Sequence, residues 1–395
     1  MDRIRVEGGR ALCGSVYIQG SKNAALPVMA AAVLHRGITV LKNCPCITDV
    51  SDMERILESL GARTMRRGHV LTLDCRDIHG FCVPLEYGRR MRSSVILMGS
   101  LLGRRGKVTV PYPGGCTIGR RPVDLHLKIF KKMGIYVEER RGMLHASCRE
   151  IQPTEHRFPF CSVGATENAI LAAAACKGRT VLKNCAVEPE VKNLCLFLKK
   201  MGVKIQGTGT DCLVIEGGSQ LKDTEFTIPS DRIAAGTYLF AGAITRGRVT
   251  LHRAPVEELT SILQVYEKMG GQYYRNSGKL VTDSRRIRYP VPYLETEAYP
   301  GFPTDMQSVL MSVLATVKGD SVIREQIFEE RFKIVSPLNR MGARILVDGR
   351  DALIHGTSAL KGQHVFAEEL RGGAALVLAG LAADGVTVIE NPHFI

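Results

Sequence analysis

The chain has 395 residues, of which 45% are hydrophobic and 23% charged, which is typical of a globular protein that buries large cores and excludes a disordered chain. Its longest apolar run, at 24–34, is too short to span a bilayer, and the N-terminus lacks the apolar segment of a signal peptide, so we expect neither a membrane span nor export. The formal net charge of +14 indicates an anionic partner, either nucleic acid or a multiply anionic small substrate.

The cysteines do not form a recognisable disulfide or metal pattern. All 12 are scattered, with only Cys44 and Cys46 closely spaced and no Cys-x-x-Cys pair. We therefore expect small buried thiols in a reducing cytoplasm.

A short strand is predicted at 1–6, and a repeated signature follows it. The signature is a basic residue, then a glycine, then a β-strand pattern, and Asp384 replaces the basic residue in the last copy. It recurs with a period of 66 to 72 residues, at 36–40, 105–110, 177–181, 246–249, 318–322 and 384–388. Such a long period favours two domains of three units each over one extended array.

Each unit is predicted to be α-β-α-β. An apolar, alanine-rich helix precedes every signature, at 24–34, 94–102, 167–176, 234–245, 305–317 and 374–383. A second helix follows the signature strand and ends at a glycine that we expect to be its C-cap, at Gly61, Gly134, Gly202, Gly270 and Gly342. The sixth signature is followed by few residues, so we expect the sixth unit to be incomplete and the second domain to leave apolar surface uncovered.

A Gly-Ser turn precedes the first of these helices. It brings Lys22 and Asn23 to the helix N-terminus, where backbone amides attract anions and Lys22 adds a full charge. The alternative is a turn whose lysine is merely solvated.

A glycine- and proline-rich loop at 113–124 interrupts the second unit. Insertions into regular repeats are often functional. Cys116 lies there close to Arg120 and Arg121, a setting that favours a reactive thiolate. The alternative is an exposed, inert cysteine.

A second Gly/Pro-rich interruption at 299–304 leads into Asp305, at the start of the fifth apolar helix. A plain helix N-cap is the structural alternative to a functional carboxylate there.

These three segments, together with Ser162–Thr166 and Phe328–Phe332, resemble the UDP-N-acetylglucosamine enolpyruvyl transferase family, in order from Met1 to Ile395. The resemblance implies an α/β fold of two inside-out barrel-like domains, 22–229 and 1–21 plus 230–395. It implies transfer of the enolpyruvyl group of phosphoenolpyruvate to the 3′-hydroxyl of UDP-N-acetylglucosamine, the first committed step of peptidoglycan precursor synthesis, in the cytoplasm and without a metal or organic cofactor.

The resemblance also implies residue roles. Lys22 and Arg121 would bind phosphoenolpyruvate, Asp305 would be the base, Cys116 would be the fosfomycin-reactive thiol, and Glu369 and Arg371 would complete the catalytic set. The implied substrate-binding set is Lys22, Asn23, Arg92, Arg121, Pro122, Val123, Asp124, Leu125, Ser162, Val163, Gly164, Asp305, Ile327 and Arg331. The chain has Glu369 where the family usually has aspartate, and an arginine that the family places after the sixth strand would be replaced by Arg120 or Arg371.

Three functions therefore remain open. The first is a working enolpyruvyl transferase. The second is a catalytically impaired relative that still binds UDP-N-acetylglucosamine, and the third is a nucleic-acid-binding protein supported only by net charge. The shikimate-pathway enolpyruvyl transferase is disfavoured by Lys22, Asn23 and the Cys116 loop.

Overall fold

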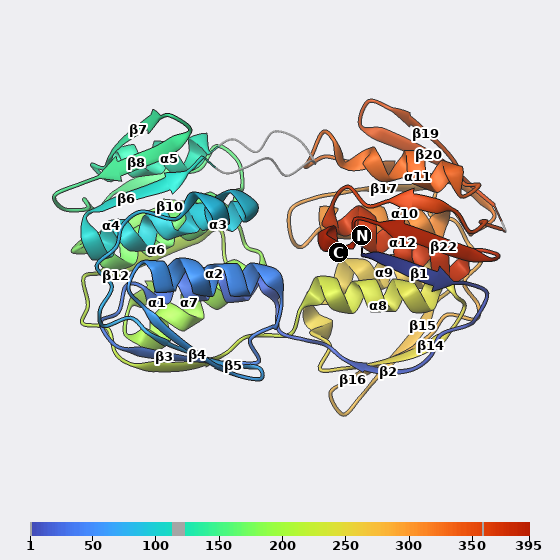
Figure 1. Ribbon diagram of the computed structural model, residues 1–395, viewed down its shortest axis with the longest axis horizontal. Helices are drawn as coiled ribbons and strands as arrows, with labels where there is room; N and C mark the ends of the chain where they lie inside the picture. Colours follow the sequence, from blue (N-terminus) through green and yellow to red (C-terminus); the bar gives the residue numbers. More distant parts are fainter. Residues whose placement is uncertain (1, 113–122, 358) are drawn as a thin grey trace. The chain divides into compact units, whose positions relative to one another are not determined.

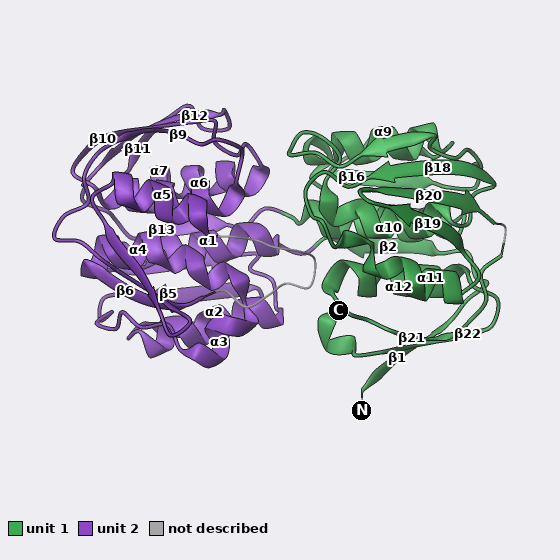
Figure 2. Cartoon of the chain, turned by 90° about the horizontal axis from the view of Figure 1, so that it is seen from above, with its two compact units in different colours: residues 1–18, 116–120, 230–395 green, residues 19–115, 121–229 purple. Residues whose placement is uncertain are grey.

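The computed structural model describes residues 2–112, 123–357 and 359–395. These residues form two compact units (Figure 2). Unit 1 contains 2–18 and the described part of 230–395, and unit 2 contains 19–112 and 123–229. Each unit has its own continuous hydrophobic core.

The first element of unit 2 is the first apolar helix, α1 (Figure 1). Its elements in chain order are α1 (Lys22–Ala32), β3 (Ile38–Lys42), α2 (Thr48–Ser59), β4 (Arg63–Arg67), β5 (Val70–Asp74), α3 (Leu85–Arg90), η1 (Arg92–Ile96), α4 (Leu97–Arg105), β6 (Lys107–Pro111), α5 (Asp124–Lys132), β7 (Tyr136–Arg140), β8 (Met143–Ser147), β9 (Glu155–Arg157), α6 (Val163–Ala175), β10 (Gly178–Lys183), α7 (Pro189–Met201), β11 (Lys204–Gln206), β12 (Cys212–Gly217) and β13 (Thr224–Thr227).

Unit 1 combines the two ends of the chain. Its elements are β1 (Arg3–Glu7), β2 (Cys13–Tyr17), α8 (Arg232–Ile244), β14 (Arg248–His252), η2 (Val256–Leu259), α9 (Thr260–Lys268), β15 (Gln272–Asn276), β16 (Lys279–Asp283), β17 (Tyr293–Glu295), η3 (Thr304–Met306), α10 (Gln307–Leu314), β18 (Gly319–Arg324), η4 (Arg331–Ile334), α11 (Val335–Arg340), β19 (Arg344–Asp348), β20 (Asp351–Gly356), β21 (His364–Phe366), α12 (Leu370–Ala382), β22 (Val386–Glu390) and η5 (Pro392–Phe394).

The six sequence signatures lie on six strands, β3, β6, β10, β14, β18 and β22, each in a different sheet of the described residues. The sheet orders are β13-β3-β5-β4, β6-β8-β7 and β11-β12-β10-β9 in unit 2, and β15-β16-β14-β2, β17-β18-β20-β19 and β1-β22-β21 in unit 1. In each of the first five units the second helix is followed by a hairpin of two strands. The predicted order α-β-α-β, which places a single strand after the second helix, is therefore wrong. Tight turns such as Ser277-Gly278, with both φ angles positive, allow the chain to reverse there.

The apolar helices lie inside the units because they are hydrophobic on nearly every side. All residues of α1 after Asn23 are buried, and α6 and α10 show the same pattern. Burial alternates along the strands instead, as in β5, where Leu71 and Leu73 are buried and the residues between and beside them are half-buried or exposed. No helix among the described residues is long and apolar enough to cross a membrane.

The predicted glycines lie at helix C-termini, but only Gly202 is itself the C-cap residue. The other four lie one residue after the C-cap residues Leu60, Met133, Met269 and Met341. Gly61, Gly134, Gly202, Gly270 and Gly342 have φ angles of 105°, 75°, 114°, 98° and 96°, a left-handed region that glycine adopts without a steric penalty.

The sheet of the sixth signature draws its antiparallel strand from the other end of the chain. β1 pairs with β22 along its whole length, from Arg3 opposite Glu390 to Glu7 opposite Val386. In the fifth unit, β20 is the antiparallel neighbour of the signature strand β18, and in the sixth unit β1 is the antiparallel neighbour of the signature strand β22. The sixth unit, which we expected to be incomplete, therefore has an antiparallel partner for its signature strand.

Candidate active site

The candidate residues of unit 2 lie at helix N-termini. Ser21 is the N-cap of α1, and its Oγ accepts a hydrogen bond from Ala24 N at 3.3 Å. Lys22 and Asn23 are the first two residues of the helix, and Lys22 Nζ lies 2.9 Å from Asp49 Oδ2. A lysine held at the positive end of a helix provides, with the backbone amides, a binding site for an anion.

The N-terminus of α6 is capped in the same way. Ser162 Oγ accepts from Ala165 N at 3.5 Å, and Val163 and Gly164 open the helix. A Cβ atom on Gly164 would lie 3.1 Å from His126 Cε1, so the glycine permits a close approach of α5.

His126 is a residue that the sequence analysis missed as a site residue. It is 5% exposed, and its Nδ1 lies 2.8 Å from Asn168 Nδ2. Asn168 Oδ1 accepts from Gly99 N at 2.9 Å, which orients the amide so that its NH₂ group faces the imidazole. We infer from this network that Nδ1 accepts and that the proton of neutral His126 lies on Nε2.

Two predicted substrate-binding residues, Arg92 and Asp124, affect the pKa of His126. Burial, assisted by the positive charge of Arg92, lowers the pKa of His126 to about 4, and Asp124 opposes this shift. Arg92, Asp124 and Gly164 are therefore gathered around one neutral imidazole. Its position in the Asp-Leu-His segment was the only sequence signal for it.

The remaining predicted residues of unit 2 include buried side chains and residues outside the described part of the chain. Val123 and Leu125 are 2% and 3% exposed and belong to the core, so their side chains are not available to a ligand. Cys116, Arg120, Arg121 and Pro122 lie outside the described residues.

In unit 1 the carboxylate of Asp305 accepts from two arginines. Arg331 Nη2 lies 2.7 Å from Oδ1, and Arg371 Nη2 lies 3.0 Å from Oδ2. The N-cap residues of η3 and α10 are Pro303 and Met306, and neither helix has a side-chain cap. The N-cap alternative for Asp305 is therefore wrong. A carboxylate can act as a proton acceptor, which is the role that a base requires.

Glu369, at the start of α12, adds a second negative charge beside Arg331 and Arg371. It is the N-cap residue, and its carboxylate accepts from Arg371 N at 2.8 Å and from Gly372 N. Its Oε2 also lies 3.7 Å from Arg331 Nη1. The longer side chain thus turns back onto its own helix.

The charge on Arg371 is secured by these acids. Burial by itself would lower the pKa of Arg371, but the carboxylates of Asp305, Asp231 and Glu369 raise the pKa above its usual value. Asp231, the N-cap of α8, completes the set, so the N-terminal ends of α8 and α12 and the helix η3 before α10 all contribute.

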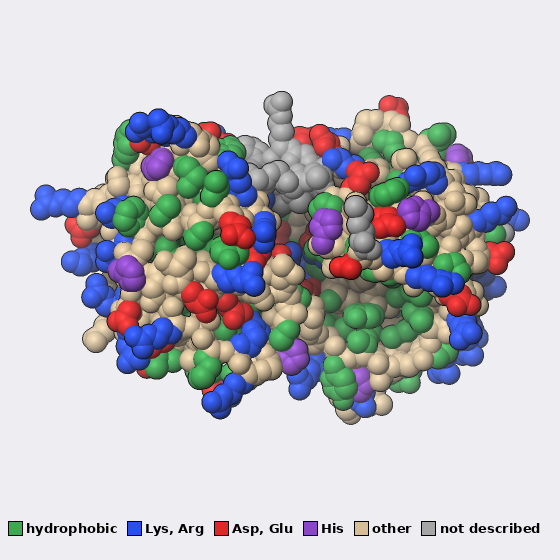
Figure 3. All heavy atoms as spheres, in the orientation of Figure 1, with side chains coloured by type: hydrophobic (Ala, Val, Ile, Leu, Met, Phe, Trp, Pro, Cys, Tyr) green, Lys and Arg blue, Asp and Glu red, His purple; other side chains and the backbone are tan. Residues whose placement is uncertain are grey.

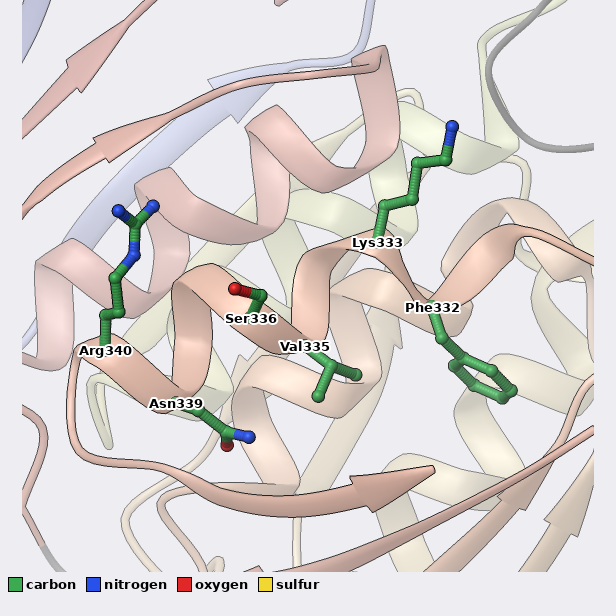
Figure 4. Close-up of a pocket in the computed structure, with 6 residues that line it drawn as sticks. All are labelled: Phe332, Lys333, Val335, Ser336, Asn339 and Arg340. Atoms are coloured by element: carbon green, nitrogen blue, oxygen red, sulfur yellow. The ribbon is translucent and has the colours of Figure 1, made fainter. Parts of the chain in front are cut away.

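One cavity of about 640 Å³ lies elsewhere on unit 1. It is lined by Phe332, Lys333, Val335, Ser336, Asn339 and Arg340 on η4 and α11 (Figure 4). None of these residues belongs to the candidate site. Figure 3 also shows Lys and Arg side chains dispersed among acidic ones on the visible face, not gathered in the stripe that nucleic-acid binding favours.

Comparison with known proteins gives full-length matches. The family model for EPSP synthase (3-phosphoshikimate 1-carboxyvinyltransferase) matches residues 6–395. The chain is 43% identical over 395 residues to UDP-N-acetylglucosamine 1-carboxyvinyltransferase 2 of Caldanaerobacter subterraneus subsp. tengcongensis, covering 100% of the chain and 95% of the relative. It is 44% identical over 400 residues to UDP-N-acetylglucosamine 1-carboxyvinyltransferase 1 of Symbiobacterium thermophilum, covering 100% and 90%.

Solved structures show the same fold. The enolpyruvyl transferase NikO from Streptomyces tendae superposes with a TM-score of 0.90 at 23% identity, covering 100% of this chain and 94% of that one. EPSP synthase from Acinetobacter baumannii gives a TM-score of 0.74 at 17% identity, covering 98% and 94%.

Proposed function

The chain belongs to the enolpyruvyl transferase family, and from that premise we propose that it transfers the enolpyruvyl group of phosphoenolpyruvate to the 3′-hydroxyl of UDP-N-acetylglucosamine, releasing phosphate. The observation that carries this assignment is the identity of 43% and 44%, over the whole chain, to two carboxyvinyltransferases that act on this sugar nucleotide. The product is a precursor of peptidoglycan.

The reaction needs a base, a proton donor and cations. Addition of the sugar hydroxyl to C2 of phosphoenolpyruvate removes the hydroxyl proton and delivers a proton to C3. Loss of a proton from C3 then restores the C2–C3 double bond as the bond from C2 to the phosphate oxygen breaks and phosphate leaves. We assign the base to Asp305, whose carboxylate is oriented by Arg331 and Arg371. Arg121 keeps the phosphoenolpyruvate-binding role, and Cys116 the role of reactive thiol, that the family resemblance implies.

The anionic parts of the substrates require positive groups. Lys22, supported by Asp49 at 2.9 Å, and the N-terminal amides of α1 suit a phosphate or carboxylate group. We assign the sugar nucleotide to Asn23, Arg92, Asp124 and Ser162–Gly164, with the backbone of 123–125. We also keep Ile327, which is 40% exposed, as the apolar substrate contact that the family resemblance implies.

A direct experiment separates the candidate functions. The protein is incubated with phosphoenolpyruvate and either UDP-N-acetylglucosamine or shikimate 3-phosphate, and phosphate release and product mass are measured. We expect an enolpyruvyl adduct of the sugar nucleotide only. Calorimetric binding of UDP-N-acetylglucosamine without product would support the impaired relative, and product from shikimate 3-phosphate would contradict the substrate assignment.

A further inference from the structure

Glu325 is a buried carboxylate beside the Asp305 turn that has no role so far. It follows β18 and is 1% exposed. A buried carboxylate destabilises a fold unless hydrogen bonds compensate it. Its partners therefore indicate what it does.

Those partners come from two segments of the candidate site. Thr304 Oγ1 lies 3.0 Å from both carboxylate oxygens. Ile327 N and Phe328 N donate to Oε1 at 2.9 Å and 3.0 Å. One carboxylate thus joins the residue before Asp305 to the segment that contains Ile327.

Thr304 is coupled to Asp305 by more than the peptide bond. Arg331 Nη2 donates to Thr304 O at 3.3 Å and to Asp305 Oδ1 at 2.7 Å. Because one nitrogen serves both acceptors, a shift of Thr304 changes the contact that orients the Asp305 carboxylate.

Glu325 is itself anchored by the turn between β19 and β20. Its backbone N donates to Arg350 O at 2.8 Å. Arg350 Nη1 donates to Gln326 O at 2.7 Å and to Glu325 O at 3.3 Å. The backbone of Glu325 is therefore tied to a regular hairpin, an element rigid enough to hold a site in place.

We propose that Glu325 is a positioning residue, which holds the Asp305 turn and the Ile327 segment in one fixed arrangement through Thr304 and the amides of 327–328. Its effect on turnover rests on the proposed function. Hydrogen bonds to a charged acceptor are the stronger kind, and a displacement of about 1 Å at a catalytic group can reduce a rate about 100-fold.

The test removes the contact from either end. T304V deletes the hydroxyl donor and keeps the side-chain shape, E325A deletes the carboxylate, and E325Q retains an acceptor for the amides of 327–328. Y266F is the matched control, because it deletes a different buried hydroxyl contact in unit 1, from Tyr266 to Ser284 at 2.8 Å.

We expect T304V to lower kcat about tenfold and E325A about 100-fold, with E325Q between E325A and the parent protein. The double variant T304V/E325A should be no more than about twofold slower than E325A, because E325A already removes the Thr304 contact. The KM for UDP-N-acetylglucosamine should change less than about threefold, since kcat carries the effect. The contradicting outcome is that T304V and E325A lower the melting temperature by as much as Y266F does, while their kcat stays equal to that of Y266F. Glu325 would then have a structural role only, and the proposal would be wrong.

A second measurement does not depend on turnover. Hydrogen exchange of the amides at 304–307 should be at least about tenfold faster in T304V and E325A than in Y266F. Unchanged exchange there would overturn the proposal. If the parent protein forms no enolpyruvyl product, the proposed function fails, and the exchange result still decides whether Glu325 holds the Asp305 turn.

Discussion

Arg331 donates to Asp305 at 2.7 Å from a side chain that is only 2% exposed. A guanidinium group so deeply buried requires negative partners, and Asp305 and Glu369 provide them. The pair therefore links the stability of unit 1 to the orientation of the proposed base.

Replacement of Arg331 by methionine should destabilise the protein and slow the proposed reaction. The change leaves two carboxylates with one fewer cation, so we expect the free energy of unfolding to fall by about 2–3 kcal/mol, below the range for fully buried pairs because Asp305 is partly exposed. Urea denaturation measures this.

The matched control for that variant is R275M. Arg275 pairs with Glu257 at 2.6 Å, but the side chains are 54% and 84% exposed. Its replacement should cost less than about 0.5 kcal/mol. Equal losses for R331M and R275M would show that burial of the Arg331 pair has no energetic consequence.

His126 should make the protein less stable in acid. Its pKa is about 4 in the folded protein because of burial and Arg92, against about 6.5 in an unfolded chain. The unfolded state then binds more protons as the pH falls below about 6.5, so stability is lost towards pH 4.

The replacement H126Q tests this. The parent protein should lose up to about 3 kcal/mol of unfolding free energy between pH 7 and pH 4 through this one group, and H126Q should show a pH dependence weaker by that amount. The measurement is urea denaturation at several pH values. An unchanged pH dependence in H126Q would mean that the imidazole titrates alike in both states.

Cysteine reactivity should be selective. Burial raises the pKa of Cys75, Cys185 and Cys195 to about 12, so these thiols stay protonated and unreactive at neutral pH. Fosfomycin in the presence of UDP-N-acetylglucosamine should modify Cys116, as the resemblance implies. Peptide mass spectrometry that finds the adduct at another cysteine and none at Cys116 would refute this.

Much of the fold follows from local sequence. The basic-Gly signatures and the glycines after Leu or Met predicted the strands and the helix ends, because turn and cap chemistry depends on neighbouring residues. Helix starts were predicted too late, at 167 and 374 where α6 and α12 begin at Val163 and Leu370. The polar and glycine residues of these first turns carry no apolar periodicity, and their caps, Ser162 and Glu369, become visible only in the structure.

What the sequence did not predict is long-range. The pairing of β1 with β22 joins the two ends of the chain, and no local pattern specifies it. His126 and Glu325 are ordinary polar residues in the sequence. Their importance comes from burial and from partners on other elements, such as Asn168 and Thr304.

The most direct test of the account compares D305N with the parent protein in single-turnover formation of the enolpyruvyl sugar nucleotide. The substitution keeps the size of the side chain but removes the proposed base, so the rate should fall by about 10²- to 10⁴-fold. Calorimetric binding of UDP-N-acetylglucosamine should remain detectable, since we assign most of its contacts to unit 2. A D305N protein that forms product as fast as the parent would contradict the central claim that Asp305, oriented by Arg331 and Arg371, is the base of enolpyruvyl transfer.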